Sequence, residues 1–156
     1  LAAVDFSPDS EAALLWGCDY AHLTGAGLVV LHVVHDPAGA PGFYHKSEAD
    51  WARPMSELAG RMFDEFLQTM RQKHDTIAHC SSLETRLVTG LPASRIVEVA
   101  GEVNARHIVV GSCGRTGLAY ILLGSVAERV VQMADQPVTV VKAARTVSTA
   151  GNEAAS

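Results

Sequence analysis

The stretch that decides the fold reads Gly111-Ser112-Cys113-Gly114-Arg115-Thr116-Gly117, followed after six intervening residues by Gly124-Ser125-Val126. It comes directly after the apolar run 107–110, which is typical of a buried strand, and before a helical pattern that begins near Gly124. In open parallel sheets, ligands bind beyond the carboxyl ends of the strands, at the point where the strand order reverses. A glycine-rich turn in this position therefore predicts a ligand site.

The composition of this turn indicates the kind of ligand. Gly111 and Gly114 allow unusual backbone angles and a close approach of main-chain N–H groups, and Gly124-Ser125 begins a helix whose first N–H groups attract an anion. One helix N-terminus stabilises a single charge by only about 0.3–1 kcal/mol, so several N–H groups, Ser125 and Arg115 would have to act together. A triphosphate offers enough acceptors for all of them. The residues alone leave two interpretations open, a phosphate-binding loop and a set of glycines that only make tight turns.

Outward from this loop, apolar runs alternate with helical patterns. Residues 28–34 are apolar almost without alternation, as in a strand that is covered on both faces, and Ser7-Pro8 marks the start of a helix. Strands are predicted at 1–5, 28–34, 83–89, 107–110 and 138–142, with helices beginning near Ser7, Pro54, Pro92 and Gly124. Strands that alternate with helices of this length predict an α/β fold, with a parallel sheet and right-handed crossovers.

Two segments do not follow this alternation of predicted strands and helices. Residues 35–53 have no periodicity and contain several Pro and Gly residues, which predicts a long loop. The chain after Ala143 is polar and built of small residues, so we expect a disordered tail. The predicted organisation is one domain over 1–143 and a tail over 144–156.

The composition and charge of the chain exclude several classes of binding partner. The 156 residues carry 12 Lys and Arg against 17 Asp and Glu, a formal charge of -5 that gives no field to hold nucleic acid. No apolar run approaches the ~20 residues that span a bilayer, and the N-terminus does not resemble a signal peptide. The three cysteines form no C-x-x-C pair, which fits a reducing compartment. These features predict a cytoplasmic protein without membrane or nucleic-acid partners.

Several other site types are not supported. The chain has no G-x4-G-K-[S/T] loop, Asp5-Phe6-Ser7-Pro8 replaces the dinucleotide-binding glycines after the first strand, and there is no G-x-S-x-G elbow. His32 and His35, three residues apart on or beside a strand, point to opposite faces and do not form a metal site. We expect His32 to be a hydrogen-bonded strand residue, and Cys113 to fill a turn rather than act as a redox centre.

The glycine motif G-x2-G-x9-G-[S/T], here Gly111 to Ser125, resembles that of the ATP-binding members of the universal stress protein family. The likeness extends to four further segments, which are 2–7, 31–34, 90–92 and 137–142. It implies an open five-stranded parallel sheet in the order 3-2-1-4-5 with helices on both faces, ATP across the ends of strands one and four, and a homodimer.

The resemblance also implies roles for single residues. Asp5 would face the ribose or a phosphate-bound Mg²⁺ or Mn²⁺ ion, Ala3 and Val33 would line the adenine pocket, and Val110 and Gly111 would lie on the ribose side. The residues implied around the phosphates are Gly114, Arg115, Gly124, Ser125 and Val126. This chain has Ala119 where many relatives have Lys or Arg, and Ala127 where Ser or Thr is frequent. Both departures remove phosphate contacts.

We consider three functions for such a chain, of which the sequence leaves the first two open. The first is an ATP-binding regulatory protein with little or no hydrolysis, because no catalytic residue is evident. The second is a dimeric interaction module that uses residues 35–53 and needs no nucleotide. The third, an ATP pyrophosphatase, would need an S-G-G-x-D-S-type loop after the first strand, which Asp5-Phe6-Ser7-Pro8 does not supply. For the first two we predict a homodimer through the last strand, 138–142, because its apolar edge is not covered by any later segment.

Overall fold

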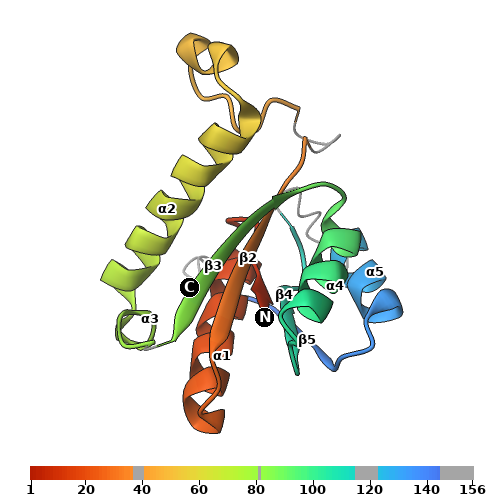
Figure 1. Cartoon of the computed structure of the whole chain (residues 1–156). Helices are drawn as coiled ribbons and strands as arrows, with labels where there is room; N and C mark the ends of the chain where they lie inside the picture. Colours follow the sequence, from red (N-terminus) through yellow and green to blue (C-terminus); the bar gives the residue numbers. More distant parts are fainter. Residues whose placement is uncertain (37–40, 81, 115–122, 145–156) are drawn as a thin grey trace, which may run out of the picture.

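The computed structural model describes residues 1–36, 41–80, 82–114 and 123–144. These residues form one sheet of five parallel strands in the order β3-β2-β1-β4-β5 (Figure 1). The strands are β1 (Ala2–Ala3), β2 (Leu28–Val34), β3 (Leu83–Thr89), β4 (Ile108–Gly111) and β5 (Val138–Val141). The predicted α/β class and the strand order are confirmed.

The short central strand β1 fixes the position of the site. Ala3 of β1 pairs with Leu31 of β2 on one side and with Val110 of β4 on the other. The chain runs outward from β1 through β2 to β3, and then crosses to the opposite side of β1 to form β4 and β5. The strand order therefore reverses between β1 and β4. The carboxyl ends of these two strands are the position, the crevice of an open α/β sheet, at which such sheets bind ligands.

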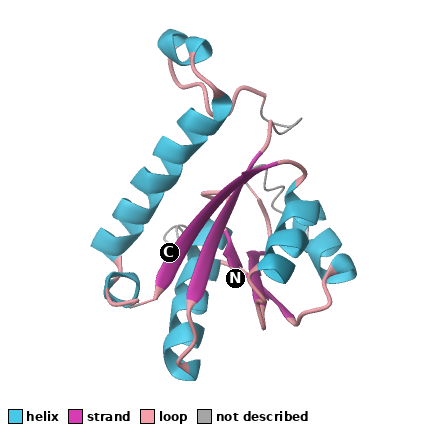
Figure 2. Ribbon diagram, in the orientation of Figure 1, coloured by secondary structure: helices cyan, strands magenta, loops and turns pink. Residues whose placement is uncertain are grey.

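Helices cover both faces of the sheet (Figure 2). One face carries α1 (Pro8–Thr24), α2 (Met55–Lys73) and α3 (Asp75–Ala78), and the other carries α4 (Pro92–Glu102) and α5 (Ser125–Met133). Successive strand side chains point to opposite faces, so Ala2 and Val30 join the core under α1 and α2, whereas Ala3 and Leu31 join the core under α4 and α5. The apolar run of β2 is explained by burial on both faces, as predicted.

Helix α1 begins and ends where the sequence indicates. The Ser7 hydroxyl accepts a hydrogen bond from the Ser10 N–H at 3.2 Å, and Gly25 ends the helix with φ +65°. Its buried face contains Ala13, Leu14, Gly17, Cys18 and Ala21, which recur at helical spacing. A Cβ at Gly17 would lie 3.4 Å from the Cβ of Ala2, so this glycine lets the helix approach the sheet closely.

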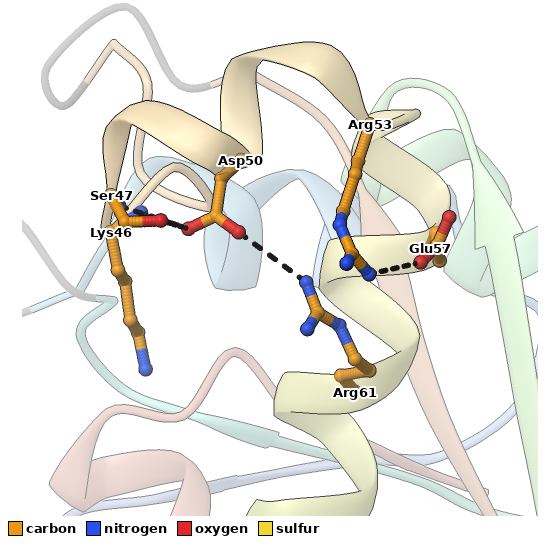
Figure 3. A network of polar contacts seen from close by, with 6 residues as sticks. All are labelled: Lys46, Ser47, Asp50, Arg53, Glu57 and Arg61. Carbon is orange, nitrogen blue, oxygen red and sulfur yellow. Dashed lines mark hydrogen bonds and ion pairs between the residues drawn. The ribbon is translucent and has the colours of Figure 1, made fainter.

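The described residues 41–54, before α2, contain secondary structure that the sequence does not predict. They contain a 3-10 helix, η1 (Glu48–Ala52), where a loop without secondary structure was expected. Both oxygens of the Asp50 carboxylate are used: Oδ2 accepts from the Ser47 N–H at 2.9 Å and its hydroxyl at 3.0 Å, and Oδ1 accepts from Arg61 at 3.4 Å (Figure 3). The hydrogen bond from the Ser47 hydroxyl lowers the pKa of Asp50. A 3-10 helix this short does not repeat apolar residues at a regular spacing, so the hydrophobic pattern of the sequence did not predict it.

Other differences are small. Helix α3 was not predicted, and the observed ends of β4 and β5 differ from the predicted ends by one residue. The tail predicted from residue 144 lies outside the described residues from 145 onward.

Candidate functional site

The loop between β1 and α1 holds a carboxylate at the crevice. Oδ1 of Asp5 accepts hydrogen bonds from the Ser7 N–H at 3.1 Å and from the Ser7 hydroxyl at 2.5 Å. The same hydroxyl lies 3.3 Å from the carbonyl oxygen of Cys113, so it connects the β1–α1 loop to the glycine loop after β4. Ser7 therefore does more than cap α1, because it also orients Asp5.

Phe6 occupies an uncommon backbone conformation between these two residues. Its φ is +68°, in a region that residues other than glycine adopt rarely. The ring compensates by packing into the core, with ring centroids 4.3 Å from His32 and 5.3 Å from Phe66. Backbone strain of this kind is common at functional sites, where the surrounding packing enforces it. Here the packing of the partly buried ring fixes the turn that presents Asp5.

Gly111, the last residue of β4, lies against the first turn of α1. A Cβ there would lie 2.8 Å from the carbonyl carbon of Asp9 and 2.9 Å from the backbone nitrogen of Ser10. Both neighbours are backbone atoms that cannot move aside. A glycine is therefore required at this position by steric contact, and not by its φ angle as the sequence argument supposed, because no positive φ occurs there.

Gly114 brings the glycine loop to Asp5. A Cβ at Gly114 would lie 2.9 Å from Oδ2 of Asp5. Positive φ angles within the described glycines occur at Gly25, Gly42 and Gly90, so the predicted unusual backbone angle at Gly114 is wrong as well. What Gly114 supplies is space beside a carboxylate.

Helix α5 begins next to the same loop. The Gly124 N–H donates to the carbonyl oxygen of Ser112 at 2.7 Å, and a Cβ at Gly124 would lie 3.2 Å from that oxygen and 3.7 Å from the nitrogen of Gly114. Ser125 and Val126 follow as exposed residues in the first turn of α5. The first N–H groups of a helix have no partner within it and carry a partial positive charge. The start of α5, which the sequence predicts near Gly124, therefore lies beside the glycine loop.

Asp9 is a site residue that the sequence reading missed. Its Oδ2 accepts from the Ser112 hydroxyl at 2.5 Å and the Cys113 N–H at 2.9 Å, and its Oδ1 accepts from the Ala143 N–H at 3.0 Å. Partial burial raises the pKa of Asp9, but these hydrogen bonds and the charge of Lys142 outweigh it and bring the pKa below its usual value. One carboxylate thus ties the glycine loop and the end of β5 to α1. An acidic residue in a first helical turn is so common that its position alone did not single it out.

An apolar wall lies beside this polar cluster. Ala3, Val33 and Val110 belong to the same buried core cluster, on the face of the sheet that α4 and α5 cover. Ala3 and Val110 are paired neighbours at the strand ends. The carbonyl oxygen of Val33 accepts a hydrogen bond from His35 Nδ1 at 3.2 Å, which places a histidine at the rim.

The structure therefore brings together most of the predicted site residues. Asp5, Gly111, Gly114 and Gly124 converge, with Ser125 and Val126 at the adjoining helix start, and Ala3, Val33 and Val110 form the neighbouring wall. Arg115 and Ala119 lie outside the described residues. Ala127 is 3% exposed and packs in the core, so a hydroxyl at that position would not reach the loop directly.

The histidines behave as core and surface residues. Both ring nitrogens of His32 are used, with Nδ1 2.8 Å from the Val4 carbonyl oxygen and Nε2 3.0 Å from the Tyr44 hydroxyl, which confirms the prediction for this residue. Over the described part of the chain, no three His, Cys, Asp or Glu side chains converge in a way that could hold a metal ion.

The strand order, the glycine loop after β4 and the helix start define a class, the open α/β proteins that bind a ligand at the reversal of strand order. Within that class, residues 1–142 match the model of the universal stress protein family, and the chain belongs to this family.

Individual relatives agree with this assignment. Universal stress protein MJ0577 of Methanocaldococcus jannaschii is 29% identical over 154 residues, which cover 91% of this chain and 93% of the relative. The solved structure of MJ0577 superposes with a TM-score of 0.67 over 93% of this chain and 95% of that one. A universal stress protein from Archaeoglobus fulgidus, solved in complex with dAMP, has 26% identity and a TM-score of 0.57 over 90% of this chain and 94% of that one.

Some relatives are longer. Universal stress protein Rv2005c of Mycobacterium tuberculosis is 31% identical over 90% of this chain, but the match covers only 46% of the relative. The chain thus spans less than half the length of several of the curated relatives it matches. In the described ranges, each helix is too short or too polar to cross a bilayer.

Proposed function

We propose that the chain is a stress-response regulatory protein that binds ATP at the crevice between β1 and β4 and hydrolyses it slowly or not at all. The observation that carries the proposal is the convergence of the Asp5 carboxylate, the Gly114 backbone and the start of α5 at the reversal of strand order. The dAMP complex of the Archaeoglobus fulgidus relative supports an adenine nucleotide as the ligand.

The fit of the residues to ATP follows from their chemistry. The apolar wall of Ala3, Val33 and Val110 suits adenine, with Val110 and Gly111 toward the ribose. Phosphates are anionic acceptors, and they suit the N–H groups at Gly114 and at the start of α5, where Ser125 and Val126 lie. We keep Arg115, the next residue in the sequence after Gly114, as a proposed phosphate ligand. A Cβ at Gly114 would fill the space beside Asp5.

A divalent cation accompanies the nucleotide in this proposal. The chain has a formal charge of -5 and Asp5 adds a carboxylate at the crevice, so an unscreened triphosphate would be repelled there. Mg²⁺ or Mn²⁺ prefers carboxylate and phosphate oxygens, and would bind between Asp5 and the phosphates. The ion would supply charge neutralisation.

The hydrogen bonds of the Asp5 and Asp9 carboxylates support slow or absent hydrolysis of ATP. Hydrolysis needs a group that orients or deprotonates the attacking water. Asp9 is committed to three hydrogen bonds within the protein, and Oδ1 of Asp5 is held by Ser7. Both carboxylates thus anchor the loops around the site, and we expect neither of them to act as the base.

Calorimetry with ATP and Mg²⁺ tests the proposal. We expect binding in the micromolar to sub-millimolar range, and Gly114→Val should abolish it, because a branched side chain would occupy the space beside Asp5. Gly101→Ala serves as the control, since a Cβ there meets no atom within 4 Å. Absence of both heat and thermal shift at millimolar ATP would reject nucleotide binding.

One observation favours a second function, a protein-interaction module. Trp51 of η1 is 69% exposed and stacks on the His45 ring with centroids 4.1 Å apart. Exposed tryptophan on an ordered surface is typical of binding hot spots. If Trp51→Ala abolished complexes formed in cells while a nucleotide-free protein still formed them, this function would replace the first.

A further inference from the structure

A buried histidine and a buried tyrosine lie next to the loop that carries Asp5. His32, near the carboxyl end of β2, is 1% exposed, and Tyr44, in the turn at 41–44, is 2% exposed. Nε2 of His32 lies 3.0 Å from the Tyr44 hydroxyl oxygen. Segments that connect a strand to a helix usually expose their side chains, so a tyrosine buried to this extent anchors its segment to the core.

The other ring nitrogen of His32 holds the backbone directly before Asp5. Nδ1 lies 2.8 Å from the carbonyl oxygen of Val4. The chain leaves the sheet at this point, because β1 ends at Ala3, although the Val4 N–H still donates to the Leu31 carbonyl oxygen at 2.9 Å. The Val4 carbonyl and the Asp5 N–H belong to one planar peptide group. His32 therefore binds the peptide group from which Asp5 begins.

The same ring supports the residue directly after Asp5. The Phe6 ring, whose backbone has φ +68°, has its centroid 4.3 Å from that of His32. The Phe63 ring of α2 also packs against His32, with centroids 5.9 Å apart. A positive φ at a bulky residue persists only where the surrounding packing enforces it. His32 thus contacts both neighbours of Asp5, Val4 through a hydrogen bond and Phe6 through its ring.

The two hydrogen bonds fix the orientation of the His32 ring. A carbonyl oxygen can only accept, so Nδ1 carries the hydrogen that is donated to Val4. In the neutral ring Nε2 is then an acceptor, and the Tyr44 hydroxyl donates to it. A ring turned over by 180° would place carbon atoms opposite both partners. Tyr44 therefore helps to keep Nδ1 directed at the Val4 carbonyl.

We propose that His32 is a positioning residue, which acts through the backbone of Val4 and Phe6 to hold the Asp5 carboxylate where ATP and its divalent cation bind. The inference rests on the proposed binding of ATP. A Cβ at Gly114 would lie 2.9 Å from Oδ2 of Asp5, so a small displacement of this carboxylate changes the space that Gly114 leaves beside it. The contacts of His32 prevent such a displacement from the side of the core.

Calorimetry with ATP and Mg²⁺ on two variants of His32 tests this role. His32→Leu keeps an apolar side chain but removes both hydrogen bonds, and we expect ATP to bind about 10-fold more weakly. His32→Asn loses the ring, but its amide N–H can still donate to the Val4 carbonyl oxygen. We expect it to bind ATP within about 3-fold of the wild type.

The stabilities of the same two variants should follow the opposite order. His32→Asn buries an amide and fills less volume than leucine, so we expect it to have a lower Tm than His32→Leu. A residue that only packed the core would lose affinity and stability together. Better binding by the less stable variant is therefore the result that separates positioning of Asp5 from packing.

Two further variants complete the series. Tyr44→Phe keeps the buried ring but removes the partner of Nε2, and we expect ATP to bind about 3-fold more weakly. His107→Leu is the matched control. His107 also packs against two aromatic rings and lies 2.7 Å from a side-chain hydroxyl, that of Thr139, but it directly precedes β4, at the amino end of the strand. It should leave ATP binding unchanged.

Hydrogen exchange of the Ser7 amide reports on Asp5 without any nucleotide. The Ser7 N–H donates to Oδ1 of Asp5 at 3.1 Å, so its exchange with deuterium is slowed while the carboxylate keeps its place. We expect NMR of the nucleotide-free proteins to show faster exchange in His32→Leu than in the wild type. The rate in His107→Leu should equal that of the wild type.

These measurements distinguish failure of nucleotide binding from failure of the positioning role. If the wild type does not bind ATP, nucleotide binding is rejected, and the Ser7 exchange rate alone decides whether His32 positions Asp5. If the wild type binds ATP, the role of His32 is overturned when His32→Leu keeps either the wild-type affinity or the wild-type exchange rate, or when His32→Asn binds more weakly than His32→Leu. Should His32→Leu fail to fold, Tyr44→Phe takes its place in both measurements.

Discussion

Gly111 and Gly114 stand three residues apart but meet very different neighbours. A Cβ at Gly111 would lie 2.8 Å from a backbone carbon of α1, whereas a Cβ at Gly114 would lie 2.9 Å from a side-chain oxygen, Oδ2 of Asp5. Backbone atoms within a helix yield only if the helix moves, whereas a carboxylate can rotate. Gly111 is therefore required for the stability of the fold, and Gly114 is required for the geometry of the candidate site.

This difference predicts opposite effects of two matched substitutions. Gly111→Ala should lower the free energy of unfolding by about 2–3 kcal/mol, because β4 and α1 must separate. Gly114→Ala should cost less than about 1 kcal/mol but weaken ATP binding by displacing Asp5. Urea unfolding and calorimetry on both variants measure the two effects. Equal stability of the two variants would show that the contact at Gly111 is not limiting.

Asp9 predicts a pH dependence. Its pKa is lower in the folded state than in the unfolded chain, so its ionisation stabilises the fold above the unfolded pKa of about 3.9, and this stabilisation is lost as the pH falls through the folded pKa. Asp9→Asn should cost about 1–3 kcal/mol at pH 7, because its hydrogen bonds lose a charged acceptor.

The cost of Asp9→Asn should therefore shrink as the pH is lowered below about 4. Urea unfolding of both proteins between neutral and acidic pH gives this difference directly. Glu102→Gln, a change at an exposed carboxylate at the end of α4, is the control and should alter stability by no more than about 0.5 kcal/mol. A cost that stayed constant with pH would exclude ionisation of Asp9 as its origin.

At the scale of the elements, the end of α1 depends on one backbone conformation. Gly25 has φ +65°, and a Cβ there would meet nothing within 4 Å. Its requirement for glycine is thus conformational and not steric, the reverse of Gly111. Gly101, near the end of α4, also has open space around it, but without a positive φ.

Gly25→Ala should therefore lower the free energy of unfolding by about 1 kcal/mol, because alanine is strained in the left-handed region. Gly101→Ala should instead leave stability unchanged or raise it by up to about 1 kcal/mol, since alanine favours a helix. Thermal and urea unfolding compare the two variants. Similar changes in both would indicate that the cap at Gly25 contributes little.

The elements also show what periodicity can and cannot reveal. The long strand β2 and the helices α1 and α2 were predicted closely, because each buries a continuous face and the apolar residues follow it. The turns η1 and α3 were missed because they hold only five and four residues. The strand order came from the resemblance to a family, since register between distant strands leaves no periodic signal.

The candidate site also has some residues that the sequence predicts and others that it does not. Its glycines and helix start could be predicted because they are close together in the sequence and follow a strand. Asp9 could not, since its partners Ser112, Cys113 and Ala143 lie more than a hundred residues away. The strained turn at Phe6 was equally hidden, because only packing against His32 and its neighbours enforces it.

For the whole molecule, the two edges of the sheet differ in their protection. The edge strand β3 carries Glu84 and Arg86, which form an ion pair at 2.6 Å, whereas the residues of β5 are Val138, Thr139, Val140 and Val141. Charged residues on an edge strand discourage pairing with another chain. The uncharged edge at β5 is only partly buried in a single chain. We therefore propose that two chains pair through β5 as a two-fold dimer.

Light scattering at micromolar concentration should then give about twice the 16.5 kDa of one chain. Val140→Lys should shift the population toward monomer, because a paired edge would bury its ammonium group against the same strand of the second chain. Thr85→Lys places the same charge on β3, the opposite edge, and should leave the dimer intact. Far-UV circular dichroism of each variant establishes that it is folded before its mass is measured. A wild-type monomer at this concentration, or a loss of dimer in Thr85→Lys alone, would rule out pairing through β5, whereas a tetramer would require a second surface in addition to it.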